Sequence, residues 1–295
     1  MKKLFLLTTF LTLLTQIGTA QNSAFDKNAF CKKLEKELVK INDSLYASKF
    51  ECSILNYRTF LSDLKTRSKD VSMFLPDTFA GWENHSKFNS KTPIYLYHPA
   101  YYEYPIFSIT REAAMAYCQW LNEVYAGYAD KKFQQMVFTL PTVSEWETAA
   151  ISFKNKNQEE AYYKKDKYIQ REIDFPWLNN NLYRENNARS SYIDLNKLSK
   201  GGSLSYLYFP DFRKANFQDQ YYQTNETVPV KSYLPNNNGM YNVCGNVAEM
   251  TLNPEITKGG SFLKYPEDCT IHDTLAMYNI PNRDVGFRVF MKVKQ

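Results

Sequence analysis

The sequence predicts an α+β fold with much irregular backbone, short strands and few helices. Helical periodicity recurs in the first half of the chain, whereas turn-forming residues crowd the part after Pro235, where only short strands fit between them. The chain has 295 residues, of which 44% are hydrophobic and 16% aromatic, so it can bury a sizeable core.

The composition excludes several classes of protein. The aromatic and aliphatic content is too high for intrinsic disorder, and five cysteines are too few for a disulfide-dense small domain. A net charge of +5, from 36 basic and 31 acidic residues, is too small and too evenly mixed to predict a nucleic-acid partner.

The first twenty residues have the pattern of a signal peptide. Lys2 and Lys3 precede an apolar run over 4–14, and small residues follow at 18–20. We therefore expect cleavage near Ala20–Gln21 and a secreted or periplasmic protein. Eleven apolar residues are too few to span a bilayer, so the mature chain is expected to have no transmembrane segment.

Helical spacing predicts an N-terminal amphipathic helix over 27–42, within a segment 21–43 whose role the sequence leaves open. Asp26 is its expected N-cap, and its apolar positions are Phe30, Leu34, Leu38 and Ile41. A strand over 45–52 follows, and then a helix capped by Ser53. The apolar face of that helix is formed by Tyr57, Phe60, Leu61 and Leu64.

Two further helices have clear start signals. Thr110 caps a helix predicted to end near Gly127, and Thr142 with Glu145 forms a capping box that opens a short helix through Ala150. One face of the longer helix carries Ala114, Tyr117, Cys118 and Leu121.

The remaining segments have no sustained period. Residues 66–104 are predicted as loop, the charged residues 151–174 as a solvated excursion, and 179–209 as a long loop or insertion. The last strand is predicted at 287–293.

Cysteine and histidine spacing predicts no zinc or thioredoxin-like site. The cysteines Cys31, Cys52, Cys118, Cys244 and Cys269 include no CxxC pair, and His85, His98 and His272 are scattered. Because five is an odd number, at least one thiol has no partner within the chain in an oxidising compartment.

Several segments, in order, resemble the formylglycine-generating enzyme (sulfatase-modifying factor) family. The likeness runs from about residue 44 to 292, so one domain is expected over 44–295, and it implies a C-type-lectin-like fold. The segments are YASKFECSILNYRTFL (46–61), PIFSITREAAMAYCQW (105–120), LPTVSEWETAA (140–150), Pro176-Trp177, PNNNGMYNVCGNVAEMT (235–251), KGGSF (258–262) and Gly286-Phe287-Arg288.

Within the family, the segment 85–105 is similar to divergent members associated with gliding motility and type IX secretion. The strings that carry this likeness are Leu75-Pro76-Asp77-Thr78 and Tyr97-His98-Pro99-Ala100-Tyr101.

The resemblance implies where catalytic residues would lie. The family's enzyme converts a sulfatase cysteine to formylglycine with oxygen and holds Cu(I) between two cysteines, the ligands that soft Cu(I) prefers. The matching positions here are Lys264 and Cys269, and an ammonium group cannot replace a thiolate. Copper is therefore not expected. Two alternatives stay open: Cys244 could supply a second thiolate, or Lys264 could lower the pKa of Cys269 and make it reactive.

Other catalytic features implied by the resemblance are altered in part. The serine of the oxygen pocket is present as Ser261, but two tryptophans of the family are replaced by Ala248 and Met250. These changes predict a pseudoenzyme without formylglycine-forming activity. The alternative is an oxidoreductase with altered metal or thiol chemistry, for which Cys269 and Ser261 are the candidate catalytic residues.

The resemblance also implies a calcium site that is intact in this sequence. Its ligands would be the side chains of Asn242 and Glu249 and the backbone carbonyls of Gly245 and Val247. The alternative is that Asn242 and Glu249 only cap turns. A second family site is doubtful, because Asn216 matches its first ligand but only Asp219 is a candidate for the next.

A family disulfide is not expected, because Val289 occupies the position that would pair with Cys118. Aromatic residues crowd one loop, where they could form a stacking surface or fill the core: Tyr95, Tyr97, Tyr101, Tyr102 and Tyr104. We expect a calcium-stabilised binding or assembly component of the cell envelope, with a protein or peptide partner.

Overall fold

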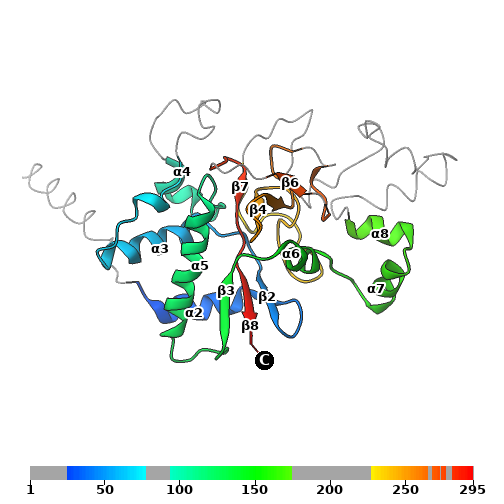
Figure 1. Ribbon diagram of the computed structural model, residues 1–295, viewed down its shortest axis with the longest axis horizontal. Helices are drawn as coiled ribbons and strands as arrows, with labels where there is room; N and C mark the ends of the chain where they lie inside the picture. The colour runs from blue at the N-terminus through cyan, green and yellow to red at the C-terminus, as the bar shows by residue number, and fades with distance from the viewer. Residues whose placement is uncertain are drawn as a thin grey trace, which may run out of the picture.

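The computed structural model describes residues 25–77, 94–174, 227–264, 268–272, 274–276 and 281–294. Helices and short strands in two small sheets confirm the predicted α+β class (Figure 1). The elements in chain order are α2 (Lys27–Lys36), β1 (Leu38–Lys40), β2 (Leu45–Ser48), α3 (Ile54–Thr66), η1 (Ser72–Phe74), α4 (Ile94–Tyr97), η3 (Pro99–Tyr101), α5 (Arg111–Ala126), β3 (Met136–Thr139), α6 (Val143–Ala150), α7 (Lys156–Tyr163), α8 (Lys167–Asp174), β4 (Ala248–Met250), β5 (Ile256–Lys258), β6 (Thr274–Ala276), β7 (Val285–Gly286) and β8 (Phe290–Val293).

The first sheet has the antiparallel order β1-β2-β8-β3 and packs against a hydrophobic cluster on each face. Side chains alternate along β8, so Phe290 enters one hydrophobic cluster and Met291 the other. Cluster 1 contains α3 and α5 residues, and cluster 2 contains α6, α7 and α8 residues. Accordingly, α2, α3 and α5 lie on the left of the sheet in Figure 1 and α6, α7 and α8 on the right.

The second sheet has the order β6-β5-β4-β7 and brings the C-terminal turns together. Strand β4 lies at its centre, antiparallel to β5 and parallel to β7. Glu249 is therefore opposite Lys258 on one side and Gly286 on the other. This placement fixes a charged residue deep inside the fold.

The predicted helix starts are confirmed. The side chains of Ser53, Thr110 and Thr142 each accept a hydrogen bond from a backbone N–H in the first turn of α3, α5 and α6. Thr142 and Glu145 form the complete capping box, with Thr142 N donating to Glu145 Oε2 at 2.8 Å. Asp26 likewise caps α2 through Ala29 N.

The N-terminal helix is shorter than predicted. It ends at Lys36, not at residue 42, because residues 38–40 form β1 and pair with β2. Ladder bonding to a neighbouring strand outweighs the helical spacing of Leu38 and Ile41. The strand predicted at 45–52 is also shorter, Leu45–Ser48, and residues 285–293 form two strands, β7 and β8.

The segment 151–174, predicted as a solvated excursion, contains the helices α7 and α8. Asn155 caps α7 by accepting from Gln158 N at 3.0 Å, and Tyr162 and Ile173 are buried in cluster 2. The predicted loop over 66–104 contains η1, α4 and η3. The expected loop over 179–209, Pro176-Trp177, and the residues Asn216 and Asp219 lie outside the described residues.

A side chain of α5 binds the outer backbone edge of β3, which is an edge strand of the first sheet. The Asn122 amide accepts from Phe138 N at 2.7 Å and donates to Phe138 O at 3.0 Å. The outward backbone groups of Phe138 are therefore satisfied.

Three consecutive asparagines close the C-terminal end of α6. Their side-chain amides donate to backbone carbonyls of residues 149–152 at 3.0–3.3 Å, and the residues are Asn236, Asn237 and Asn238.

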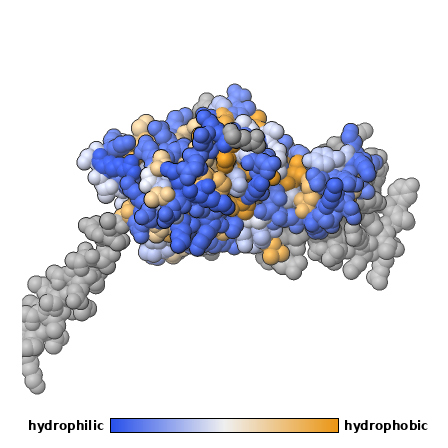
Figure 2. All heavy atoms as spheres, turned by 90° about the horizontal axis from the view of Figure 1, so that it is seen from below, coloured by the Kyte–Doolittle hydropathy of each residue, from blue (hydrophilic) through white to orange (hydrophobic). Residues whose placement is uncertain are grey.

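The surface seen from below is mostly hydrophilic, with apolar side chains in small separate groups (Figure 2). Large exposed apolar side chains come from separate elements: Met73, Leu75, Tyr97, Val137, Tyr163 and Leu234. Among the described residues, no helix has both the length and the apolar character required to cross a bilayer.

Candidate functional site

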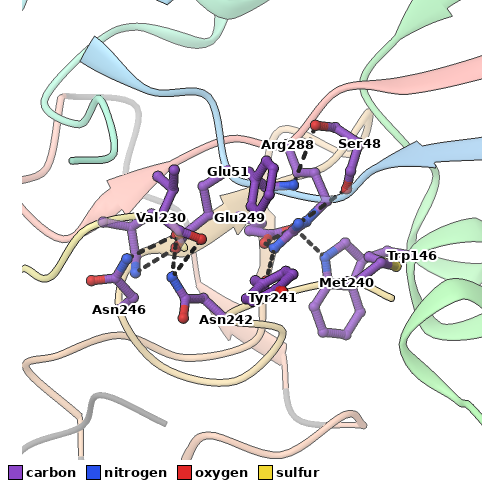
Figure 3. Close-up of polar contacts among 12 residues, drawn as sticks. Ser48, Glu51, Trp146, Val230, Met240, Tyr241, Asn242, Asn246, Glu249 and Arg288 are labelled. Carbon is purple, nitrogen blue, oxygen red and sulfur yellow. Dashed lines mark hydrogen bonds and ion pairs between the residues drawn. The ribbon is translucent and has the colours of Figure 1, made fainter. Parts of the chain in front are cut away.

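A buried ion pair between Glu249 and Arg288 anchors the site (Figure 3). Arg288 donates from Nη2 to Glu249 Oε1 at 2.6 Å and from Nε to Oε1 and Oε2 at 2.9 and 3.1 Å. The indole N–H of Trp146 donates to Glu249 Oε2 at 2.7 Å. These contacts hold β4 against α6 and against the segment between β7 and β8, and all three side chains are buried.

Arg288 also binds three backbone carbonyls. It donates from Nη1 to Ser48 O at 3.1 Å and to Lys49 O at 2.7 Å, and from Nη2 to Tyr241 O at 2.6 Å. One guanidinium thereby joins the end of β2, the loop before β4 and β4 itself.

Glu51 is a second buried carboxylate, and it organises the loop over 242–247. It accepts hydrogen bonds from Asn242 Nδ2 at 2.9 Å, Asn246 Nδ2 at 2.8 Å and Val247 N at 3.2 Å. Burial raises the pKa of Glu51 to about 8; Glu249 raises it further, while Arg288 and the asparagine amides oppose the rise. Two buried carboxylates thus share one buried guanidinium.

The loop adopts backbone conformations that its sequence permits. Asn242, Gly245 and Asn246 all have positive φ angles, of 49°, 79° and 61°. Asparagine and glycine tolerate this left-handed region better than other residues do. Gly245 N donates to Gly259 O at 2.7 Å, which holds the loop against the Gly259-Gly260 turn.

Three of the four predicted calcium ligands lie in this loop and Glu249 follows in β4; two observations fit a hard cation. Asn242 Oδ1 is buried and accepts no hydrogen bond, although its Nδ2 is fully engaged. The second observation is that the buried Glu51 carboxyl, whose pKa is raised to about 8, is hydrogen-bonded to this loop, where a bound cation would favour its charged form.

The donor set suits calcium except at Glu249. The carboxylate of Glu249 has about four acceptor positions and already accepts four hydrogen bonds from Trp146 and Arg288. Within the described residues no group of three or more His, Cys, Asp or Glu side chains could hold a metal. A cation here would therefore depend on amide and carbonyl oxygens, as Ca²⁺ sites commonly do.

The predicted catalytic residues lie together beyond the Gly259-Gly260 turn. Cys269 is 0% exposed, and its Sγ lies 3.7 Å from Ser261 O. Ser261 Oγ donates to the buried Asp284 Oδ2 at 2.7 Å. Lys264 is half-buried.

Gly260 leaves no room between the turn and Cys269. A Cβ added to Gly260, whose φ is +69°, would lie 2.5 Å from Cys269 Sγ and 2.8 Å from Asp268 O. The side of Cys269 that faces the turn is therefore filled by backbone. Cys244 is also buried and belongs to the same hydrophobic cluster.

Ala248 and Met250, at which the resemblance implies tryptophans, are part of the core. Both are buried in cluster 1 with residues of α3 and α5. Cys118 is buried as a thiol, and Val289 is buried at the position of its family partner.

A small cavity of about 30 Å³ lies beside Glu51, not beside Cys269. Its lining includes Glu37, Glu51, Cys52, Ser53 and Tyr117. This volume has room for a water molecule and not for an organic substrate.

The crowded aromatic residues divide between core and surface. Tyr95, Tyr101 and Tyr104 pack against cluster 1, whereas Tyr97 is 48% exposed. The Arg58 guanidinium lies 5.5 Å from the Tyr97 ring centroid and 4.6 Å from that of Tyr102. Core packing therefore explains part of this segment, and a stacking surface at Tyr97 stays a prediction.

The sequence reasoning missed Glu51, Trp146 and Asn246 as members of the site, and it treated Arg288 only as part of a motif. The available signal was the charged Glu51 near the end of the predicted strand 45–52, next to the helix cap Ser53.

A family model described as "Sulfatase-modifying factor enzyme 1-like domain" matches residues 11–293. Among solved structures, the chain is similar to the crystal structure of CarF, with 16% identity, a TM-score of 0.51, and coverage of 85% of this chain and 87% of that chain. It is also similar to Treponema denticola variable protein 1 (14% identity, TM-score 0.45, 86% and 90% covered) and to PvdO from Pseudomonas aeruginosa (15%, 0.47, 84% and 80%). The likeness to CarF shows the fold alone. No curated protein matches the sequence.

Proposed function

Because the chain belongs to the sulfatase-modifying factor enzyme 1-like domain family, we propose that it is a calcium-stabilised member without formylglycine-forming activity. It acts as a secreted or periplasmic binding or assembly component of the cell envelope. The observation that carries the proposal is the pair of positions 264 and 269, which offers one ammonium group and one fully buried thiol.

The surroundings of Cys269 support the same conclusion. Its thiol faces the Gly260 backbone and the Ser261 carbonyl, and the Ser261 hydroxyl is engaged by Asp284. Ala248 and Met250 fill the core at the positions of the family's tryptophans. The rival oxidoreductase would need a substrate to reach a thiol that has no exposed surface.

The link to gliding motility and type IX secretion is part of this proposal and rests on the strings at 75–78 and 97–101. The exposed Tyr97 beside Arg58 and Tyr102 is the surface best suited to a peptide, because Tyr and Arg side chains dominate binding energy at protein interfaces.

The test of inactivity is incubation of the purified protein with Cu(I), oxygen and a sulfatase-motif peptide, followed by mass spectrometry of the peptide cysteine. No conversion is expected, in parallel with an active family enzyme as the positive control. Conversion that disappears in Cys269→Ala would refute the proposal and favour the oxidoreductase.

The calcium claim is tested with two glycine variants, since glycine keeps the left-handed backbone at both positions. Chelation is expected to lower the melting temperature of the wild type, and Asn242→Gly should remove that sensitivity because it deletes the unpartnered oxygen. Asn246→Gly is the control: Asn246 Oδ1 already accepts from Val228 N at 2.9 Å, so the calcium response should persist. A wild type that does not respond to chelation would end the claim.

A further inference from the structure

The helical pair α7–α8 stands at one side of the molecule, at the far right of Figure 1. It is joined to the body near its C-terminal end. Ile173 and Tyr162 are buried in cluster 2, and Ile271 N donates to Asp174 O at 3.2 Å. Ile169 of α8 also packs against this cluster, and the backbone bond of Asp174 lies at the end of the pair.

His272 lies at this attachment between two carboxylates. Its Nε2 is 3.1 Å from Asp174 Oδ1 and 3.2 Å from the Tyr162 hydroxyl, while its Nδ1 is 4.0 Å from Glu147 Oε2. Asp174 and Tyr162 come from the helical pair, whereas Glu147 comes from α6.

A buried lysine completes the group. Lys258 of β5 has no exposed side-chain surface, and its Nζ lies 2.8 Å from Glu147 Oε1. Lys258 thus holds Glu147 in place through Oε1, and the other carboxylate oxygen, Oε2, faces His272. A protonated imidazole would connect the Asp174 end of α8 to this fixed carboxylate.

We propose that His272 is a protonation-dependent latch that fastens the α7–α8 pair to the body of the protein. In its charged form the imidazolium attracts Asp174 on one side and Glu147 on the other. In its neutral form it retains at most a hydrogen bond to Asp174 and loses both charge attractions. The pair is then held by Ile173, Tyr162 and the backbone bond to Asp174.

The direction of the pH effect follows from the groups that face His272. The hydrogen bond to Asp174 raises the pKa of His272 above 6.5, burial opposes this, Asp174 and Glu147 attract the charged form, and Lys258 repels it. The Tyr162 pKa is raised, so its hydroxyl stays neutral. Because the folded pKa is raised, the latch is complete below the unfolded pKa and is lost as pH rises through the folded value.

The test is amide hydrogen exchange of the full chain at pH 5.5 and 8.5, expressed as protection factors so that the intrinsic rate cancels. Protection of residues 156–174 is expected to fall about two- to five-fold at the higher pH, relative to α5, as suits a partly exposed ion pair. His272→Gln should abolish this dependence because glutamine keeps polarity but cannot be charged. His98→Gln, which changes an exposed histidine on the opposite cluster's side, should leave it intact.

An unchanged pH dependence in His272→Gln would overturn the proposal, as would an equal loss of protection in α5. A second measurement is independent of variant stability: titration of His272 by NMR in the wild type should give a pKa above 6.5. A value at or below 6.5 would also overturn the latch.

Discussion

Replacement of Arg288 by methionine tests whether the buried ion pair supports the fold. Methionine keeps an unbranched apolar chain but removes the guanidinium that pairs with Glu249. It also leaves the carbonyls of Ser48, Lys49 and Tyr241 without these donors. The perturbation therefore strands a buried charge and three main-chain acceptors together.

The magnitude follows from the burial of both partners. Arg288 is 0% and Glu249 1% exposed, so neither solvent nor salt can replace the lost interaction. Breaking such a pair by removing one partner costs about 3–5 kcal/mol, and the carbonyls place Arg288→Met at the upper end of that range. A typical domain has about 5–15 kcal/mol in total, so the variant would be close to unfolding.

The assay is urea unfolding of Arg288→Met, Glu249→Gln and the double variant, with calcium and with chelator. Because Glu249→Gln removes the stranded charge, the double variant should be less destabilised than the sum of the two singles by about 1–3 kcal/mol. Lys164→Met is the control: Lys164 is 78% exposed and lies 3.8 Å from Glu160, so its loss should change stability by less than about 0.5 kcal/mol. Additive single-variant costs, or a cost of Arg288→Met below about 1 kcal/mol, would refute the reasoning.

Three further outcomes are expected. Trp146→Phe removes the indole donor to Glu249 and should lower the free energy of unfolding, measured in urea, by about 2 kcal/mol. An unchanged urea midpoint would contradict the role of that hydrogen bond. Gly260→Ala should lower the free energy of unfolding by at least about 3 kcal/mol, because the alanine would need a left-handed backbone and its Cβ would overlap Cys269. Adding Cys269→Ala should restore only part of the melting temperature, since Asp268 O would still lie 2.8 Å from that Cβ. Full restoration would argue against overlap with the backbone. Burial raises the pKa of Cys31 to about 11 and that of Cys118 to about 12. After treatment with an alkylating reagent at pH 8, peptide mapping should therefore find both thiols unmodified in the native protein and modified in the unfolded protein. Rapid labelling of the native protein would show that these sites open.

The parts of the fold that local rules govern were predictable from the sequence. Ser53, Thr110 and Thr142 cap their helices through neighbouring backbone groups, and Ala114 and Leu121 share one buried helix face. Interactions between distant segments were not predictable in the same way. Leu38 and Ile41 continue a helical spacing, but pairing of β1 with β2 decides their conformation.

The candidate site shows the same division. Asn242, Gly245 and Glu249 lie on one continuous segment, so a motif could identify them. Glu51 is about 200 positions earlier and Arg288 about 40 later, and only the folded chain brings their charges together. The helices α7 and α8 were missed because mostly polar residues surround a few apolar positions that enter cluster 2, among them Tyr162 and Ile173.

The contact between Asn122 and β3 bears on how this protein stays separate from other copies of itself. A strand from a second molecule could extend the sheet only by first displacing an amide that already engages both outward groups of Phe138. Loss of this one side chain would leave an open template next to the exposed Val137. A single asparagine on a helix therefore blocks pairing of a further strand with Phe138 on this edge.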